Sequence, residues 1–353
     1  MNKSIGISER LENLPMHLYA LNFSSRKKKF LICCFPGKKI SFIKNIEKIK
    51  KNTALILWGS TPCPNALPLD FPIVRVEDGF LRSVGLGVEL TRPLSWIVDT
   101  KGIYFDATKI SDLECILKDT IFSEEQLSRA AALHQLIIES GITKYNVGSG
   151  EWKRPAHAKK VILVPGQVES DASIAKGAAD IRNNMTLLKS VREKNPDAYV
   201  LYKPHPDVVA RLRISGIDEE KAFHWCDECI IDIPMEKLLM QIDEVHTMTS
   251  LTGFEALLRG KSVTCYGNPF YAGWGLTTDI HPLERRSRNL SLNALIAGAL
   301  IIYPCYFNDE SLHLISPEAA LALLNTYKIK KQGKILWWRA IYRSILRKVI
   351  GIY

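Results

Sequence analysis

The strongest architectural signal in this chain is the stretch Lys160-Val-Ile-Leu-Val-Pro-Gly-Gln-Val-Glu-Ser-Asp-Ala-Ser-Ile174. It begins with an apolar, β-branched run typical of a buried strand, and polar side chains follow that run directly. The same order returns in Ala198-Tyr-Val-Leu-Tyr-Lys-Pro-His-Pro-Asp207. Ligands of open α/β sheets bind at the carboxyl ends of the strands. The two stretches therefore predict an α/β enzyme that handles an anionic, phosphate-bearing substrate.

Strands and helices are predicted to alternate on both sides of this stretch. Strands are expected at 30–34, 54–58, 73–76, 96–98, 160–164, 198–202, 229–231, 244–246 and 263–265, and helices at 42–49, 112–119, 123–140, 181–193, 234–242, 252–259 and 290–302. The Gly-, Ser- and Pro-rich residues 146–157 separate two halves. We expect two doubly wound, Rossmann-like domains, 1–150 and 151–327, that face a central cleft.

The composition is that of an ordinary globular protein. The chain has 353 residues, 46% of them hydrophobic and 24% charged. No apolar run reaches the roughly eighteen residues of a transmembrane helix, and the N-terminus lacks signal-peptide features. Eight cysteines show no disulfide framework. These features predict a cytoplasmic protein with reduced thiols. Cys226-Asp-Glu-Cys229 has no second such pair to complete a zinc site, so we expect no metal.

The positive charge is concentrated at the C-terminus. The net charge is +10, yet residues 328–353 contain eight Lys or Arg and no Asp or Glu. This excess is not spread over a folded face, as nucleic-acid binding would require. Residues 334–350 fit an amphipathic helix, so 328–353 is expected to lie on an anionic membrane surface. The alternative is a helix docked on the protein's own core.

Two groups of polar residues follow the two strands quoted above. If residues 169–171 are extended, Glu169 and Asp171 point the same way and can divide catalytic work. The alternative is that Asp171 only caps the turn that follows. In Lys203-Pro-His-Pro206, the prolines hold the His205 imidazole in one direction. It is suited, with Lys203, to bind a phosphate or a leaving nucleotide.

Two further polar groups are expected at strand ends. Thr249-Ser-Leu-Thr-Gly-Phe-Glu255 opens a predicted helix, where hydroxyls and free backbone amides favour an anion. Glu255 can accept hydrogen bonds from a ribose; the alternative is an ordinary helix cap. In the first half, Glu77 and Asp78 form a second acidic pair, and Arg82 is suited to bind a carboxylate.

Several motifs together resemble the capsule polysaccharide synthesis family, in particular its KpsC-type β-Kdo glycosyltransferase modules. They are Glu77-Asp-Gly-Phe-Leu-Arg-Ser83, Ile103-Tyr-Phe-Asp-Ala107, Thr143-Lys-Tyr-Asn146, Val161-Ile-Leu-Val-Pro-Gly-Gln-Val-Glu169, Tyr202-Lys-Pro-His-Pro-Asp207, Glu244-Val-His-Thr-Met-Thr-Ser250, Gly253-Phe-Glu-Ala-Leu257 and Phe270-Tyr-Ala-Gly-Trp-Gly-Leu276. They run in order from about residue 53, and the chain carries one module, most similar to the C-terminal one. The first 30 residues match no recognised pattern.

The resemblance implies a GT-B fold and a retaining transfer of Kdo from CMP-β-Kdo to a lipid-linked, Kdo-containing glycan, without cofactor or metal. It implies Asp171 as the nucleophile, with Glu169 the close alternative, and His205 assisting the departure of CMP. The implied donor-binding residues are Gln167, Lys203, His205, Ser250, Thr252, Gly253 and Glu255. The implied acceptor-side residues are Glu77, Asp78 and Arg82. Location on the inner face of the cytoplasmic membrane, with other capsule synthesis and export proteins as partners, follows from the same resemblance.

Two other functions fit the same residues. One is another CMP-sugar transferase of the sialyltransferase type, which also combines an acidic motif with a His-Pro motif. The other is a non-catalytic protein of polysaccharide export. The presence of both acidic pairs and His205 argues against this second function, because a decayed transferase is expected to lose some of them.

Overall fold

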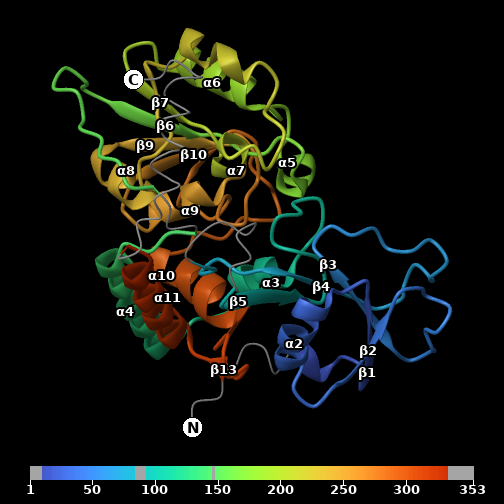
Figure 1. The fold of residues 1–353 in the computed structure, drawn as a ribbon. Coiled ribbons are helices and arrows are strands. Elements are labelled where there is room, and N and C mark those ends of the chain that lie inside the picture. The colour runs from blue at the N-terminus through green and yellow to red at the C-terminus, as the bar shows by residue number, and fades with distance from the viewer. Residues whose placement is uncertain (1–9, 84–92, 145–147, 333–353) are drawn as a thin grey trace.

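The computed structural model describes residues 10–83, 93–144 and 148–332. The chain forms two β-sheets with helices packed around them (Figure 1). The two-sheet α/β architecture predicted from the sequence is therefore confirmed. Within the described residues, no helix combines the length and the apolar character needed to span a membrane.

The second sheet contains the two strands that dominated the sequence pattern. Its strands are β6 (Val161–Pro165), β7 (Tyr199–Lys203), β8 (Glu228–Cys229), β9 (Glu244–Thr247), β10 (Ser262–Cys265) and β11 (Thr278–Asp279). Their order is β11-β10-β9-β6-β7-β8, and every pairing is parallel. The winding direction reverses between β6 and β9, which makes their carboxyl ends the topological switch point of a doubly wound sheet.

Short helices connect the strands of the second sheet. They are α5 (Ala172–Gly177), α6 (Asn184–Lys194), α7 (Pro206–Val209), a 3₁₀ helix (Glu219–His224), α8 (Met235–Gln241) and α9 (Leu251–Leu257). Four of them begin at side chains that cap them: Asp171 for α5, Asn183 for α6, His205 for α7 and Ser250 for α9. Asp171, His205 and Ser250 lie in the segments that follow β6, β7 and β9, so these helix starts place polar side chains at the sheet edge.

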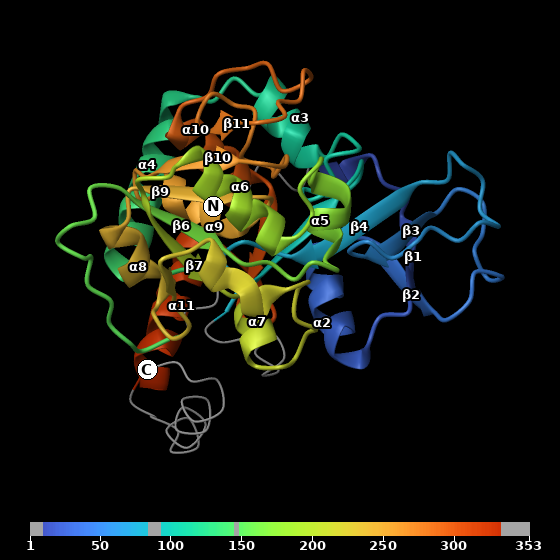
Figure 2. The ribbon, with the colours of Figure 1, turned by 90° about the horizontal axis from the view of Figure 1, so that it is seen from above.

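The first sheet has the order β13-β12-β5-β4-β3-β1-β2. Its strands are β1 (His17–Leu21), β2 (Lys39–Ile43), β3 (Ala54–Trp58), β4 (Ile73–Asp78), β5 (Ser95–Asp99), β12 (Pro304–Phe307) and β13 (Leu314–Ile315). The strands from β2 to β4 are parallel, whereas β5, β12 and β13 add antiparallel pairings. In both views β1 and β2 lie at the end of this sheet remote from the second sheet (Figure 1, Figure 2).

Two local predictions in the first half are wrong. Residues 30–34, expected as a strand, form the end of helix α2 (Ser25–Cys34), and residues 42–49, expected as a helix, begin with the end of strand β2. In α2 the buried residues are Phe30, Leu31 and Cys34, which share one helical face. A short apolar run fits either element, and here the basic residues ahead of it form the exposed face of a helix.

The predicted boundary of the second domain is also incorrect at its C-terminal side. Strands β12 and β13 lie within 151–327, yet β12 pairs with β5 of the first sheet. Helices α3 (Asp112–Asp119), α4 (Glu124–Ser140), α10 (Leu292–Ile296), a π-helical turn (Ala297–Ile302) and α11 (Pro317–Gln332) accompany the first sheet. The chain therefore crosses between the halves twice.

The predicted basic tail begins inside α11. Lys328 Nζ donates to the carbonyl oxygens of Ser140, at 3.3 Å, and Gly141, at 2.8 Å, and lies 3.3 Å from Glu236 Oε1. Lys328 thus connects the end of α4 with α8 instead of facing a membrane. The expected amphipathic helix at 334–350 lies outside the described residues.

Candidate active site

A cleft of about 660 Å³ lies between the two halves. Its walls come from the ends of β4, β6, β7 and β9 and from the segment that follows α4. Among the predicted site residues, those that line it are Glu77, Asp78, Arg82, Gln167, Asp171, Lys203, His205, Ser250, Thr252 and Glu255. The volume is within the range of about 300–1,000 Å³ that is usual for ligand sites. The acidic and basic groups predicted from separate motifs are therefore brought together.

Gln167 holds the two loops at the switch point together. Its Nε2 donates to Thr249 Oγ1, at 2.9 Å, while its Oε1 accepts from Thr249 N, at 3.0 Å. Its own backbone amide donates to Asn184 Oδ1, at 2.9 Å. Both polar atoms of the Gln167 side chain therefore fix the loop after β6 against the loop after β9, which makes Gln167 a positioning residue at the cleft floor.

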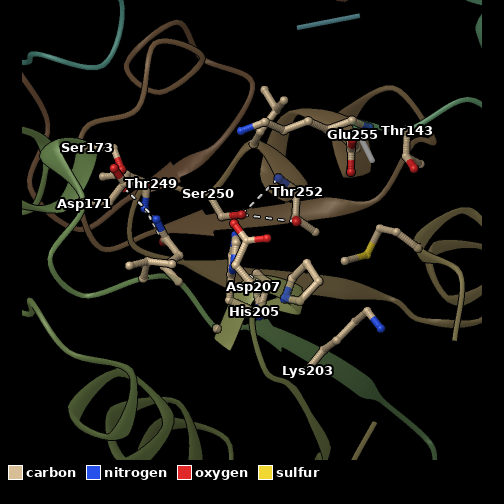
Figure 3. A pocket seen from close by; sticks show the side chains of 18 of the residues that line it. Thr143, Asp171, Ser173, Lys203, His205, Asp207, Thr249, Ser250, Thr252 and Glu255 are labelled. Atoms are coloured by element: carbon tan, nitrogen blue, oxygen red, sulfur yellow. Dashed lines mark hydrogen bonds between the residues drawn. The ribbon is translucent and has the colours of Figure 1, made fainter. Parts of the chain in front are cut away.

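Asp171 is an exposed carboxylate in the cleft wall. It precedes α5, and its Oδ1 accepts a hydrogen bond from the backbone amide of Ala172, at 3.1 Å. In the close-up, Asp171 and Ser173 lie on the same side of the cleft as Thr249 (Figure 3). The capping role and a catalytic role are compatible here, because the cap occupies only one of the two carboxylate oxygens.

Glu169 does not share the cleft with Asp171, so the prediction that the two carboxylates share one face is wrong. Glu169 Oε1 accepts from Asn184 N, at 2.8 Å, and Oε2 accepts from Ile217 N, at 3.0 Å. The segment is a turn, closed by a hydrogen bond from Asp171 N to Val168 O at 2.9 Å. In a turn, residues i and i+2 do not point the same way, and Glu169 therefore acts on loop structure.

His205 is held in one orientation, and its ring is uncharged near neutral pH. Its Nδ1 accepts a hydrogen bond from Asp207 N, at 3.2 Å, which leaves the ring proton on Nε2. Burial lowers the pKa of His205 to about 4, and the charges of Lys144 and Arg213 act in the same direction. The imidazole is thus suited to donate a neutral hydrogen bond, and it adds no positive charge near neutral pH.

Lys203 is half-buried and bound to backbone carbonyl groups. Its Nζ donates to Ile233 O, at 2.8 Å, and to Ile231 O, at 3.1 Å. Burial lowers the pKa of Lys203 to about 8, although the charge of Asp232 opposes this shift. In the close-up the Lys203 side chain extends away from His205 (Figure 3). Two of its three ammonium protons fix the segment after β8, so one proton remains for a ligand.

The start of α9 presents two hydroxyl groups. Ser250 Oγ accepts from Thr252 N, at 3.2 Å, and donates to Thr252 Oγ1, also at 3.2 Å. Gly253 has a different role from the predicted one. A Cβ placed on Gly253 would lie 2.2 Å from the Tyr271 hydroxyl, which donates to Ser250 O. Gly253 therefore lets Tyr271 pack against α9 and does not line the cleft.

Glu255 is a buried carboxyl group in the opposite wall. Its Oε1 accepts a hydrogen bond from the backbone amide of Lys144, at 2.6 Å. Burial raises the pKa of Glu255, and this amide hydrogen bond opposes the shift. In the close-up it lies beside Thr143 (Figure 3). Glu255 thus attaches the segment after α4 to α9 and presents its carboxyl group to the cleft.

The predicted acceptor-side residues lie on the first-sheet wall of the same cleft. Asp78 Oδ2 and Arg82 Nε form an ion pair of 2.7 Å. Glu77 Oε1 accepts from Asp78 N, at 2.9 Å. Burial raises the pKa of Glu77 to about 7, and the charge of Asp78 adds to this shift. Glu77 is therefore partly protonated near neutral pH, whereas Arg82 is already paired.

The structure adds cleft residues that the sequence arguments gave no role. These are Thr143, Lys144, Asp207, Arg213, Asp232 and Phe270. Phe270 stacks on Phe80 with ring centroids 4.5 Å apart, so the loop after β10 contacts the acceptor-side segment. Asp232 follows β8 at the same sheet edge as His205, and this placement was predictable from the strand order. Lys144 and Arg213 follow helices and show no strand-end signal.

In the part of the chain that the structure describes, no cluster of three or more His, Cys, Asp or Glu side chains is arranged to hold a metal ion. Burial raises the pKa of Cys226 to about 11 and that of Cys229 to about 12. Both cysteines are therefore thiols at neutral pH.

Two facing sheets with a polar cleft at a switch point define a GT-B-like α/β protein. Residues 54–306 match the family model "Capsule polysaccharide biosynthesis protein". The chain therefore belongs to the capsule polysaccharide biosynthesis family.

Curated relatives include the capsule polysaccharide modification protein LipA of Neisseria meningitidis serogroup B, which is 42% identical over 98% of this chain and 51% of its own length. The lipopolysaccharide-processing protein LpsZ of Rhizobium meliloti is 43% identical over 72% of this chain and 59% of its own length. The chain thus spans about half the length of LipA.

Two solved structures from Thermosulfurimonas dismutans KpsC are similar throughout. The chain described as a beta Kdo 2,7 transferase is 41% identical, with a TM-score of 0.74, and the alignment covers 88% of this chain and 99% of that one. The beta Kdo 2,4 transferase is 30% identical, with a TM-score of 0.76, over 89% and 99%. Both likenesses extend across the two halves and hence across the cleft.

Proposed function

We propose that this protein transfers Kdo, with retention of the β configuration, from CMP-β-Kdo to a Kdo-containing glycan. The observation that carries the proposal is the exposed Asp171 carboxylate in a switch-point cleft, in a chain 41% identical to a β-Kdo transferase. The acceptor in this proposal is lipid-linked, and the product serves capsule or surface polysaccharide synthesis. The greater identity to the 2,7 transferase than to the 2,4 transferase favours the 2,7 linkage.

The first step is a displacement by Asp171. A carboxylate oxygen of Asp171 forms a bond to the anomeric carbon of Kdo, and the bond from that carbon to the phosphate oxygen breaks. CMP leaves with the bonding electron pair. His205 Nε2–H donates a neutral hydrogen bond to the departing phosphate, and the hydroxyl groups of Ser250 and Thr252 lie in the same cleft. Glu255 contributes a carboxyl group for the ribose.

The second step restores the enzyme. The acceptor hydroxyl oxygen bonds to the anomeric carbon, the bond to Asp171 breaks, and the hydroxyl proton is taken up by a base. Glu77 is suited to accept this proton because its pKa of about 7 is close to the working pH. Two inversions at one carbon give net retention. In this proposal Arg82, which is paired with Asp78 in the cleft wall, contacts the carboxylate of the acceptor sugar.

The test is replacement of Asp171 with Asn. Transfer from CMP-Kdo, generated in situ, to a synthetic Kdo-terminated acceptor is expected to fall by at least about a thousandfold, while CMP affinity by calorimetry is retained. Without acceptor, the native protein is expected to gain the mass of one Kdo, which peptide mapping places on Asp171. NMR of the product gives the linkage and the anomeric configuration.

Glu169→Gln is the matched control. Because Glu169 accepts two backbone hydrogen bonds outside the cleft, this change is expected to lower stability and to leave the mass adduct on Asp171. A normal turnover rate in Asp171→Asn, or an adduct mapped to another residue, contradicts the proposed nucleophile. Preferred use of CMP-sialic acid over CMP-Kdo contradicts the proposed donor.

We also propose that residues 328–353 hold the protein on the inner face of the cytoplasmic membrane, close to a lipid-linked acceptor. The support is the sequence, with eight Lys or Arg and no acidic residue in this segment. Each cation near an anionic lipid surface contributes on the order of 1 kcal/mol. Because Lys328 is bound within the fold, the residues after α11 carry this role.

A further inference from the structure

Among the predicted donor-binding residues, only Lys203 carries a positive charge near neutral pH. His205 is neutral, since burial lowers its pKa to about 4, and Lys203 Nζ donates to two carbonyl oxygens. Six carboxyl side chains line the same cleft: Glu77, Asp78, Asp171, Asp207, Asp232 and Glu255. A nucleotide phosphate that enters this surrounding needs cations close to it.

Among the described residues, the Lys and Arg side chains that line the cleft are Arg82, Lys144, Lys203 and Arg213. Arg82 is paired with Asp78 on the first-sheet wall, and Lys203 is held by the segment after β8. Lys144 and Arg213 line the cleft as well, and the sequence arguments assigned no role to either of them. Arg213 is exposed and makes no ion pair with the described residues.

The backbone fixes where these two side chains start. The Lys144 amide is bound by Glu255 of α9, at 2.6 Å, so Lys144 starts beside the helix that carries Ser250 and Thr252. The Arg213 amide donates to Asp207 O, at 3.1 Å, so Arg213 starts beside α7 and His205. The charges of both residues lower the pKa of His205 and that of Asp207, although burial leaves the pKa of Asp207 raised overall. Lys144 and Arg213 therefore act on the same part of the cleft from two different segments.

We propose that Lys144 and Arg213 form an anion subsite beside His205 that binds the phosphate of the nucleotide donor. This inference rests on the proposed function, which it deepens by assigning the charge that recognises the donor. In this arrangement the two cations neutralise the phosphate, and His205 Nε2–H orients it. The site is divided between the segment after α4 and the loop after α7, so it is complete only when the two halves face each other.

The test compares Lys144→Gln and Arg213→Gln with Arg211→Gln. Arg211 is an exposed arginine two residues from Arg213 that does not line the cleft, so its replacement removes the same charge without touching the subsite. Affinities for CMP and for uncharged cytidine are measured by calorimetry at low and high salt. Each cleft variant is expected to bind CMP about tenfold more weakly. The affinity that remains is expected to depend less on salt than that of the native protein. Cytidine affinity is expected to stay unchanged in all variants.

Inorganic phosphate is the second probe, because it tests the subsite without assuming the nucleotide. Phosphate is expected to raise the melting temperature of the native protein and of Arg211→Gln, and to raise that of the double variant Lys144→Gln/Arg213→Gln less. Lys144→Arg, which keeps the charge, is expected to retain CMP binding. This variant separates loss of charge from loss of packing at a half-buried position.

The outcomes separate this inference from the proposed function. If CMP and phosphate bind equally well to the double variant and to the native protein, the anion subsite is wrong even if Kdo transfer occurs. If phosphate stabilises the native protein in a manner that depends on Lys144 and Arg213, but neither CMP binding nor transfer is found, the subsite stands and the proposed function fails. An equal loss in Arg211→Gln also overturns the subsite, because it shows a non-local effect of charge.

Discussion

At the scale of single residues, Glu77 and Asp171 are two carboxyl groups in contrasting surroundings within one cleft. Asp171 is exposed, and one of its oxygens caps α5. Glu77 is half-buried, and loss of solvation raises its pKa to about 7. Different surroundings of two carboxyl groups are how one site provides both an ionised group and a proton-exchanging group. The pair suited to divide the work therefore spans the two sheets and is not the neighbouring pair Glu169 and Asp171.

The raised pKa of Glu77 predicts a specific dependence on pH. If deprotonated Glu77 accepts the acceptor proton, kcat is expected to rise as pH increases through about 7 and then to level off. Glu77→Gln is expected to lower kcat by about 10²- to 10⁴-fold and to remove this rise. The measurement is the rate of Kdo transfer across a pH series, with a saturating donor.

The raised pKa of Glu77 also predicts how the stability of the protein depends on pH. Between pH 4.5 and about 7 the folded protein binds more protons at Glu77 than the unfolded chain does, so the free energy of unfolding is expected to decrease as pH rises through this window. Glu77→Gln is expected to flatten that decrease. If the variant keeps both the native pH–rate profile and the native pH–stability profile, the environment assigned to Glu77 is wrong.

Residue identity alone did not decide which of Glu169 and Asp171 lines the cleft, and the local backbone geometry distinguishes them. The hydrogen bond from Asp171 N to Val168 O bends the segment, so the two side chains diverge. A sequence pattern records which residues are two positions apart, but not whether they lie in an extended segment or in a turn. The motifs also identified Lys203 and His205 as cleft residues. They could not show that His205 is neutral or that Lys203 binds backbone carbonyl groups, because these properties depend on burial and on partners distant in sequence.

At the scale of elements, the start of α9 depends on a close contact that only glycine allows. Gly253 faces Tyr271, whose ring is buried and whose hydroxyl group donates to Ser250 O. Tyr271 is thus packed against the helix start that carries the hydroxyl groups of the cleft. Gly253 therefore allows packing behind the cleft, whereas Ser250 and Thr252 line the cleft itself.

Gly253→Ala is therefore expected to destabilise the protein. The added Cβ would lie 2.2 Å from the Tyr271 hydroxyl and 2.7 Å from its Cζ. Displacement of a buried ring costs about 1–3 kcal/mol, which urea unfolding can measure. In a double-mutant cycle, Tyr271→Phe is expected to recover part of this loss, because it removes the nearest atom. Strict additivity of the two changes would contradict the contact.

Long patterned elements were predictable, and short apolar runs were not. Helix α4 was expected at 123–140 and runs from Glu124 to Ser140, because Ser123 and Gln126 form a capping box that the sequence displays. In contrast, 30–34 could be a strand or a helix from its composition alone. Packing of Phe30 against Trp96 and Phe307, which are distant in sequence, favours the helix.

At the scale of the whole molecule, removal of residues 333–353 separates the fold from the proposed membrane segment. This deletion removes five Lys or Arg and leaves α11 and the contacts of Lys328 in place. Binding to vesicles with anionic lipid is expected to be lost in a co-sedimentation assay. Transfer to a soluble acceptor is expected to persist, and neutral vesicles serve as the control. Retained binding to anionic vesicles, or a large loss of stability, would instead favour a helix docked on the protein.

The return of the chain to the first sheet was not predictable from local patterns. Alternation of strands and helices indicates a sheet in each half, but it does not indicate which sheet a late strand joins. Strand β12 pairs with β5 across about two hundred residues of sequence, and Arg10 reinforces this region by donating to Tyr303 O, at 2.6 Å, and to Val98 O, at 2.8 Å. Such pairings are determined by tertiary packing.

The double crossing has a mechanical consequence. The segment between α4 and β6 and the segment between β11 and β12 both join the two halves, so any relative motion must bend both connections at once. Two bodies joined at two points rotate easily only about the line through those points. Under the proposed function, entry and exit of the sugar nucleotide are then expected to follow a rocking movement about a single axis, because the two connections resist sliding or free twisting of one half against the other.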